Sequence, residues 1–195
     1  MLKKSFIFFF AVFLLQLMNS CLFRCPDPGT FENIYYGVTI TAFNTAGFYP
    51  VEVVDSVYKN AFGLTVSVNF ETKQIAATKP RLIPEFKSAY AFSCEEDTYL
   101  YPDPIKNLEI YAINPDHSEK INATSWFSIY GYNSDLLGLE EFMKIRELWH
   151  DGFQIELSDY QSVPSDVVFE AEVQLESGTT FTNQTTLIHF KNPVK

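Results

Sequence analysis

The sequence predicts a mainly β protein, an immunoglobulin-like β-sandwich with one short inserted helix at about residues 136–149. Three observations lead to this prediction. Phe62–Phe70 alternates strictly between apolar residues and small or polar ones, which is the period of a strand with one face in a core. Eight short runs rich in β-branched and aromatic residues are separated by turn residues. Only one segment shows helical spacing.

The predicted strands follow one another along the whole chain. Each run is bounded by Pro, Gly, Asn or Asp, the residues that end strands. The expected strands are Tyr35–Phe43, Phe62–Phe70, Ser88–Cys94, Ile105–Ile113, Thr124–Gly131, Phe153–Leu157, Val167–Leu175 and Thr179–Phe190. Ser177-Gly178 connects the last two runs, so we expect a terminal hairpin there.

The predicted helix covers Leu136–Trp149. Apolar residues and one arginine recur there at spacings of three and four, at positions Leu139, Phe142, Met143 and Arg146. Acidic residues come early in this segment and basic residues late, which suits the dipole of a helix. Asp151-Gly152 then ends it.

The first twenty residues have the composition of an export signal. Lys3 and Lys4 give a basic start, and the apolar run Phe6–Leu15 follows. This run is too short to cross a bilayer of about 30 Å as a helix. We therefore expect residues 1–20 to be a signal peptide that is removed on export.

The signal ends at Met18-Asn19-Ser20-Cys21, which resembles a bacterial lipobox. The resemblance implies that the Cys21 thiol is joined to diacylglycerol, that cleavage falls before Cys21, and that the new amine is acylated, for example with palmitate. Two or more acyl chains make a stable anchor. We then expect a lipidated tether at 21–33 and a single β-sandwich domain at 34–195. The alternative is an ordinary signal peptide with a coincidental cysteine.

Leu22, and not an aspartate, follows the lipidated cysteine, so no signal for retention in the inner membrane is evident. The expected location is therefore the outer membrane of the cell envelope. Either face of that membrane fits the sequence.

The mature chain is strongly acidic. The whole sequence has a formal net charge of −10, and loss of Lys3 and Lys4 takes it to −12. This charge argues against nucleic acid as a partner, because nucleic-acid binding needs a basic face. It also argues against adsorption to anionic lipids, which leaves the acyl anchor as the membrane contact. The charge keeps a tethered domain in solution, and it also fits calcium or a cationic partner.

Two cysteines remain if Cys21 carries lipid. In an oxidising compartment we expect Cys25 and Cys94 to form a disulfide. A closed loop of about 70 residues would contribute roughly 4 kcal/mol in the chain-entropy model. The alternative is two free thiols, with Cys94 buried as a small apolar residue.

Several different short motifs follow one another along the chain. They are Cys21 with its lipobox, Ala89–Cys94, Asp103-Pro104-Ile105, Leu108-Glu109-Ile110, Leu139–Phe142 and the hairpin at Ser177-Gly178. Together they resemble an uncharacterised lipoprotein family of Bacteroidetes, built around a domain of unknown function. The resemblance covers roughly residues 21–190. It implies the anchor, the envelope location and one β-rich domain, and it brings no catalytic residue.

In that setting Asp55-Ser56-Val57 resembles the acceptor motif for O-glycosylation of exported Bacteroidetes proteins. The motif lies where we expect a loop. The resemblance therefore makes Ser56 a candidate glycosylation site.

No pattern in the sequence predicts a catalytic residue, a metal or a cofactor. The chain lacks a G-x-S-x-G elbow, and its three histidines do not have zinc-site spacing. Glu95, Glu96 and Asp97 could serve a glycosidase or, together with Asp103, bind calcium, but neighbouring acids in a loop are normally solvated.

The best candidates for ligand binding are Tyr99, Tyr101 and Asp103, because aromatic rings beside acids can form a recognition loop for sugars. The alternative is that these tyrosines cover the edge of the core. We expect a non-enzymatic lipoprotein that binds or scaffolds a glycan or another protein of the envelope. The alternatives are a secreted, glycosidase-like hydrolase and a structural or adhesive surface subunit.

Overall fold

The computed structural model describes residues 28–77, 96–130, 136–145 and 152–191. Its chain divides into two compact units, residues 1–31 with 74–100 and residues 32–73 with 101–195. The second unit contains the hydrophobic core. In the first unit β5 (Thr98–Leu100) pairs with β1.

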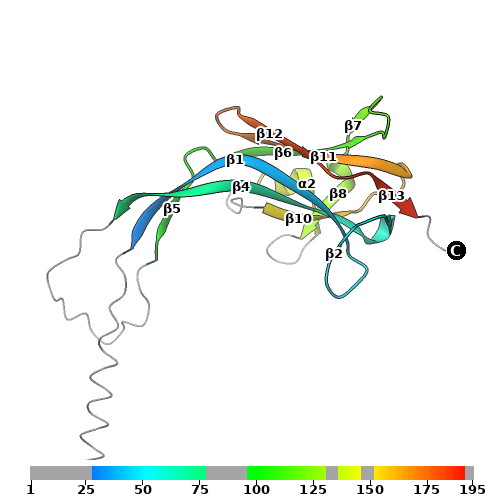
Figure 1. Cartoon of the computed structure of the whole chain (residues 1–195), viewed down its shortest axis with the longest axis horizontal. Coiled ribbons are helices and arrows are strands. Elements are labelled where there is room, and N and C mark those ends of the chain that lie inside the picture. The colour runs from blue at the N-terminus through cyan, green and yellow to red at the C-terminus, as the bar shows by residue number, and fades with distance from the viewer. Residues whose placement is uncertain (1–27, 78–95, 131–135, 146–151, 192–195) are drawn as a thin grey trace, which may run out of the picture. The chain divides into compact units, whose positions relative to one another are not determined.

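Most described residues lie in strands (Figure 1). The strands besides β5 are β1 (Gly29–Asn44), β2 (Val51–Glu52), β3 (Ser56–Tyr58), β4 (Phe62–Ala77), β6 (Ile105–Ile113), β7 (Lys120–Asn122), β8 (Phe127–Tyr130), β9 (Leu136–Gly138), β10 (Gly152–Leu157), β11 (Asp166–Leu175), β12 (Thr180–Gln184) and β13 (Ile188–Lys191). The helical turns are η1 (Lys59–Ala61), η2 (Thr124–Trp126) and α2 (Leu139–Phe142).

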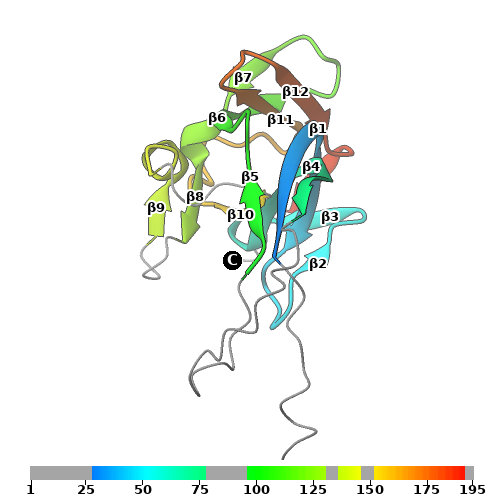
Figure 2. The ribbon, with the colours of Figure 1, turned by 90° about the vertical axis from the view of Figure 1, so that its left-hand side faces the viewer.

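The strands form two sheets. The first has the order β2-β1-β4-β10-β8-β9, and the second has the order β3-β13-β11-β6-β7, with β12 also on β11. Figure 2 shows the two ends of the first sheet on opposite sides, with β8 and β9 at one side and β1 and β4 at the other. The predicted sandwich of two sheets is confirmed.

The strand order is that of an immunoglobulin-like domain. If β1, β4, β6, β8, β10, β11 and β13 are lettered A to G, the first sheet contains A-B-E-D and the second contains C-F-G. The pairs β10–β4, β10–β8, β11–β6 and β11–β13 are antiparallel, and β3 joins the edge of β13 in parallel. The predicted fold class is therefore confirmed at the level of topology.

The alternating run in β4 forms the centre of the core. Phe62, Leu64, Val66 and Val68 are each at most 3% exposed, whereas Thr65 on the other face is partly exposed. Burial of each such apolar side chain contributes about 1.5–3 kcal/mol. The one-faced strand predicted at 62–70 is confirmed, and β4 continues beyond it to Ala77.

Strand β1 is longer than the predicted Tyr35–Phe43. It begins at Gly29, inside the range expected for the tether. The side chains that face the core change phase near Gly37: Tyr35 is buried before it, and Val38 and Ile40 after it. This shift of one residue hides the period from a sequence pattern that assumes regular alternation.

The predicted strand Thr124–Gly131 starts later than expected. Thr124–Trp126 forms the turn η2, because the Trp126 N–H donates to the Ala123 carbonyl (2.9 Å) and the Thr124 hydroxyl accepts from the Ile110 N–H (3.0 Å). Strand β8 follows this turn. The predicted strand Ser88–Cys94 lies outside the described residues.

The inserted helix is present but covers only part of the described stretch 136–145, and residues 146–149 of the prediction lie outside the described residues. Leu136–Gly138 pairs with β8 as strand β9, and α2 covers only Leu139–Phe142. Leu139 and Phe142 are buried, so their spacing of three fits a single turn against the core as well as a long helix. Within the described ranges, no helix has the length and apolar character needed to span a membrane.

The terminal hairpin lies where the sequence predicts it. Gly178 has φ +90°, a value that favours glycine, and the Gly178 N–H donates to the Leu175 carbonyl (3.0 Å). The expected last strand divides into β12 and β13. At the break, the Thr185 N–H donates to the Phe169 carbonyl (2.8 Å), and the Phe169 N–H donates to the Thr185 hydroxyl (3.0 Å).

Two glycine substitutions test this packing. A Cβ at Gly63 would lie 2.7 Å from the Ile155 carbonyl oxygen and 2.7 Å from the Phe43 ring, so Gly63→Ala forces β4 and β10 apart. We expect the free energy of unfolding, measured by denaturant titration, to fall by about 1–3 kcal/mol. Gly138→Ala is the matched control, since a Cβ there meets no atom within 4 Å. Equal effects of the two substitutions would contradict the β4–β10 packing.

Candidate binding surfaces

The predicted sites fall in different parts of the molecule. Cys21, Cys25 and Cys94, the candidates for lipidation and the disulfide, lie outside the described residues. Tyr99 belongs to the first unit, whereas Ser56, Tyr101 and Asp103 belong to the second.

In the first unit, Tyr99 and Asp97 contact the start of β1. The Tyr99 ring stacks on Phe31 with centroids 5.4 Å apart, and Tyr99 is 50% exposed. The Asp97 carboxylate accepts a hydrogen bond from the Gly29 N–H (2.8 Å). About half of the Tyr99 surface is therefore accessible to a ligand. Asp97 instead fixes the backbone at the start of β1.

In the second unit, Tyr101 and Asp103 have structural contacts. Tyr101 packs against the core, and its ring stacks on Tyr35 with centroids 6.3 Å apart. The Asp103 carboxylate accepts from the Ser177 N–H (2.8 Å). These contacts fit the alternative in which Tyr101 covers the core edge, and they show that Asp103 holds the turn of the terminal hairpin.

Ser56 lies at the start of β3 and not in the expected loop. It is partly buried, and its Cα partner in the parallel pair with β13 is His189. His189 is in turn the partner of Asp166 on β11, and its Nδ1 lies 2.5 Å from the Asp166 carboxylate. Residues in register on adjacent strands share a face. A serine, a histidine and an aspartate thus lie side by side.

This arrangement lacks what a serine nucleophile needs. Hydrolytic triads have a buried aspartate and a histidine within hydrogen-bond reach of the serine. The His189 and Asp166 side chains are 56% and 51% exposed. Among the described residues, no hydrogen bond joins Ser56 to the histidine ring. The His189–Asp166 pair therefore connects β13 with β11 at the surface. No pattern in the sequence indicates this pair, because only strand pairing brings the two residues together.

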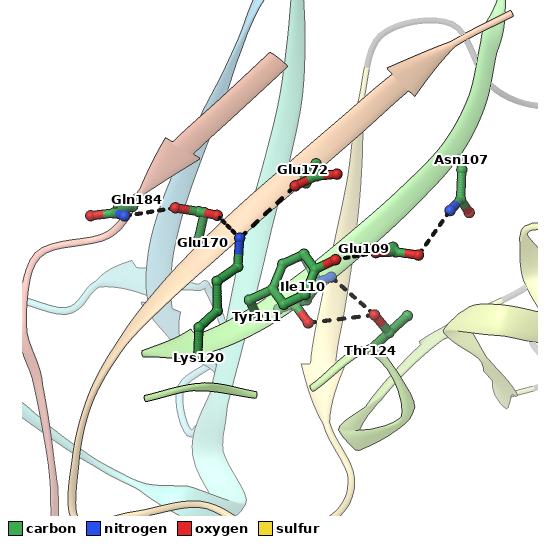
Figure 3. Close-up of polar contacts among 9 residues, drawn as sticks. All are labelled: Asn107, Glu109, Ile110, Tyr111, Lys120, Thr124, Glu170, Glu172 and Gln184. Carbon is green, nitrogen blue, oxygen red and sulfur yellow. Dashed lines mark hydrogen bonds and ion pairs between the residues drawn. The ribbon is translucent and has the colours of Figure 1, made fainter. Parts of the chain in front are cut away.

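A polar network covers the outer face of the second sheet (Figure 3). The Lys120 ammonium lies 2.6 Å from a Glu170 carboxylate oxygen and 3.9 Å from Glu172, and it sits 3.9 Å from the centre of the Tyr111 ring. The Gln184 amide donates to the second oxygen of Glu170 (2.7 Å). Four strands, β6, β7, β11 and β12, contribute to these contacts.

The network shifts the pKa of two of its members. Burial acts to raise the pKa of Glu170, but hydrogen bonds from Gln184 and Lys120 and the charge of Lys120 outweigh it, and the pKa falls below its ordinary value. The Tyr111 hydroxyl donates to Glu109, and this bond, with burial and nearby carboxylates, raises the pKa of Tyr111 to about 12. Every one of these groups has a polar partner within the network. The network therefore joins the strands that carry it, and its hydrogen-bonding groups are already paired.

A shallow depression lies on the outer face of the first sheet. It has a volume of about 360 Å³ and is lined by Thr65, Ser67, Gly152, Phe153 and Gln154. Its lining contains no charged side chain. Gly152 permits the close approach of β10 to β4, since a Cβ there would lie 2.7 Å from the Val66 carbonyl oxygen.

The three most exposed large apolar side chains among the described residues lie in one short segment of the second unit, together with a fourth exposed apolar side chain. Between β1 and β3, Phe48 is 93% exposed, Val54 85%, Tyr49 73% and Val51 64%. The Phe48 and Tyr49 rings touch edge to face, with centroids 5.0 Å apart. We call residues 46–54 the apolar loop. Its signal in the sequence was Phe48–Val51, an apolar run at a place where turns are normally polar.

The apolar loop stands on a fixed base. The Thr45 N–H donates to the Ala61 carbonyl (2.8 Å), and the Val53 N–H donates to the Ala42 carbonyl (3.0 Å). The Asn44 side chain accepts from the Ala46 N–H (2.8 Å). Both ends of the loop are therefore hydrogen-bonded to the sandwich and Val53 packs against the core, while the other apolar side chains of the loop are exposed.

No protein-family model matches this sequence, and neither a curated protein nor a solved structure matches it. Among the residues that the structure describes, no group of three or more His, Cys, Asp or Glu is placed to hold a metal ion.

The Lys120 contacts give a pH-dependent prediction. Lys120→Met removes the charge that offsets the burial of Glu170, so we expect the pKa of Glu170 to rise, as measured by NMR titration of the carboxyl carbon. In the natural protein, Glu170 contributes stability that is present above its unfolded pKa and is lost as the pH falls through its lower folded pKa. Lys120→Met should reduce this loss.

Lys106→Met is the control, because Lys106 is an exposed lysine on β6 outside the network. A Glu170 pKa that responds equally to both substitutions would show that general charge, and not the Lys120 contact, sets its value.

Proposed function

We propose that this protein is a non-enzymatic binding or scaffolding module of the cell envelope, held at the outer membrane by a lipid on Cys21. The observation that supports binding is the apolar loop, whose exposed side chains stand on a hydrogen-bonded base. The export signal, the lipobox and the resemblance to Bacteroidetes lipoproteins support the location.

The amount of apolar surface fits an interface. The four exposed side chains of the loop present on the order of 500 Å² of mostly apolar area, as much as the largest patch of a typical monomer. A stable interface buries about 800 Å² on each partner, so the loop suffices for its apolar centre. Aromatic side chains at such centres often dominate the binding energy.

The base of the loop favours binding further. A loop that is ordered before it binds loses less conformational entropy when its partner arrives. Hydrogen bonds at Thr45 and Val53 supply this order, because they join the loop to Ala61 and Ala42.

The lipid anchor predicts a change of location in the natural host. The Cys21 thiol would displace the phosphate head group of a phospholipid, which leaves with the thiol proton, and so form a thioether to diacylglycerol. Water would then hydrolyse the Ser20–Cys21 peptide bond, and the freed amine of Cys21 would take an acyl chain from a second phospholipid, which leaves as a lysophospholipid. Cys21→Ala prevents the first step, so we expect the protein to leave the membrane fraction. Cys25→Ala is the control and should stay there. A membrane-bound Cys21→Ala protein would contradict the anchor.

The disulfide predicts a mass difference. If Cys25 and Cys94 are joined, the intact mass of the mature protein should rise by two hydrogens on reduction. An unchanged mass would contradict the disulfide.

The binding proposal is tested by a photoreactive amino acid at position 48 of the full-length protein in its host. We expect illumination to give an adduct of defined mass. The same amino acid at Tyr36, which is 65% exposed on the outer face of β1, is the control and should not give that adduct. The absence of an adduct specific to position 48 would contradict the proposed role of the loop.

A further inference from the structure

We propose that the partner of the apolar loop is a different protein, which offers an apolar pocket bordered by lysine or arginine side chains. This inference rests on the proposed function and adds to it the chemistry of the partner.

The charges around the loop support a basic border. Residues 44–58 contain two acids, Glu52 and Asp55, and no lysine or arginine. Both acids are exposed, and Glu52 lies in β2, where it pairs with Phe43. Both acids follow Phe48 and Tyr49 along the chain. The next cation, Lys59, is held at the Val163 carbonyl, to which its ammonium donates a hydrogen bond (2.5 Å). Complementary charge on the partner would speed association and select against wrong partners.

The same charges disfavour an anionic lipid surface. Loops and helices that bind such membranes combine apolar side chains with lysine or arginine, which attract the head groups. The apolar loop has the opposite charge, so head groups would repel Glu52 and Asp55 as Phe48 approached the bilayer.

The charges also disfavour a second copy of this chain. A symmetric contact between two apolar loops would bring the same acids of both copies together. The whole chain carries a formal net charge of −10, so the long-range repulsion acts in the same direction.

The projection of the loop favours a concave partner. Its ends are fixed at Thr45 and Val53, while Phe48 is almost wholly exposed. A protruding, ordered loop fills a pocket better than it covers a flat surface, as long binding loops of other folds do. Phe48 and Tyr49 would enter the pocket, and Glu52 and Asp55 would meet its border.

The test measures the photo-adduct at position 48 in the full-length protein, with and without Glu52→Lys/Asp55→Lys. We expect these substitutions to lower the adduct yield about tenfold at low salt, and less at high salt, because they reverse the attraction at the border. Glu140→Lys/Glu141→Lys is the matched control: it reverses two exposed acids on α2, changes the net charge equally, and should leave the yield unchanged.

Mass spectrometry of the adduct identifies the partner surface. A peptide of another protein, from an apolar site with lysine or arginine around it, would support the inference. A lipid adduct, an adduct with a second copy of the chain, or a yield that does not respond to Glu52→Lys/Asp55→Lys would overturn it and leave the proposed binding role standing. If position 48 gives no adduct, both the inference and the binding role fail.

Vesicles provide a second measurement. Phe48→Trp places a fluorescent reporter on the loop, and we expect its emission to stay unchanged with vesicles of phosphatidylcholine alone or mixed with phosphatidylglycerol. A blue shift with either composition would overturn the inference in favour of a lipid surface.

Discussion

The structure depends on aromatic packing between the two sheets. Phe62 of the first sheet stacks on Phe169 of the second, with centroids 5.4 Å apart, and meets Phe190 edge to face at 5.0 Å. Phe127 of the first sheet reaches the same Phe169 ring at 5.4 Å. Such pairs add to the free energy of burial and fix the relative positions of the strands that carry them. The hydrogen-bonded base of the apolar loop is built on the strands and turns that this packing positions.

The outer surface of the second sheet and the apolar loop differ in how far their side chains contact other side chains. On the second sheet, Lys120, Glu170 and Tyr111 meet one another, so that face is polar and internally paired. On the apolar loop, Phe48 and Val54 meet solvent, although the backbone beneath them is hydrogen-bonded. A hydrogen-bonded backbone that carries solvent-exposed apolar side chains is the combination expected of a contact surface.

The sequence predicted what local periodicity determines. Ile105–Ile113 coincides with β6, and the apolar face of β4 is as expected, since alternation and burial agree there. Within the described residues 136–145 the predicted helix was too long, because the spacing of Leu139 and Phe142 fits a single turn as well. The pairing of His189 with Asp166 could not be predicted from the sequence, because it depends on which strands become neighbours. The turn-holding role of Asp103 depends on the hairpin in the same way.

Oxidative footprinting tests most directly whether the apolar loop is a contact surface in the envelope. Hydroxyl radicals would be generated in intact cells of the host and, separately, around the purified protein, and oxidation at Phe48, Tyr49 and Tyr36 would be measured by mass spectrometry. We expect Phe48 and Tyr49 to be strongly protected in cells and Tyr36 to react equally in both samples. Equal oxidation of Phe48 and Tyr49 in cells and in solution would contradict the role of the loop as a contact surface.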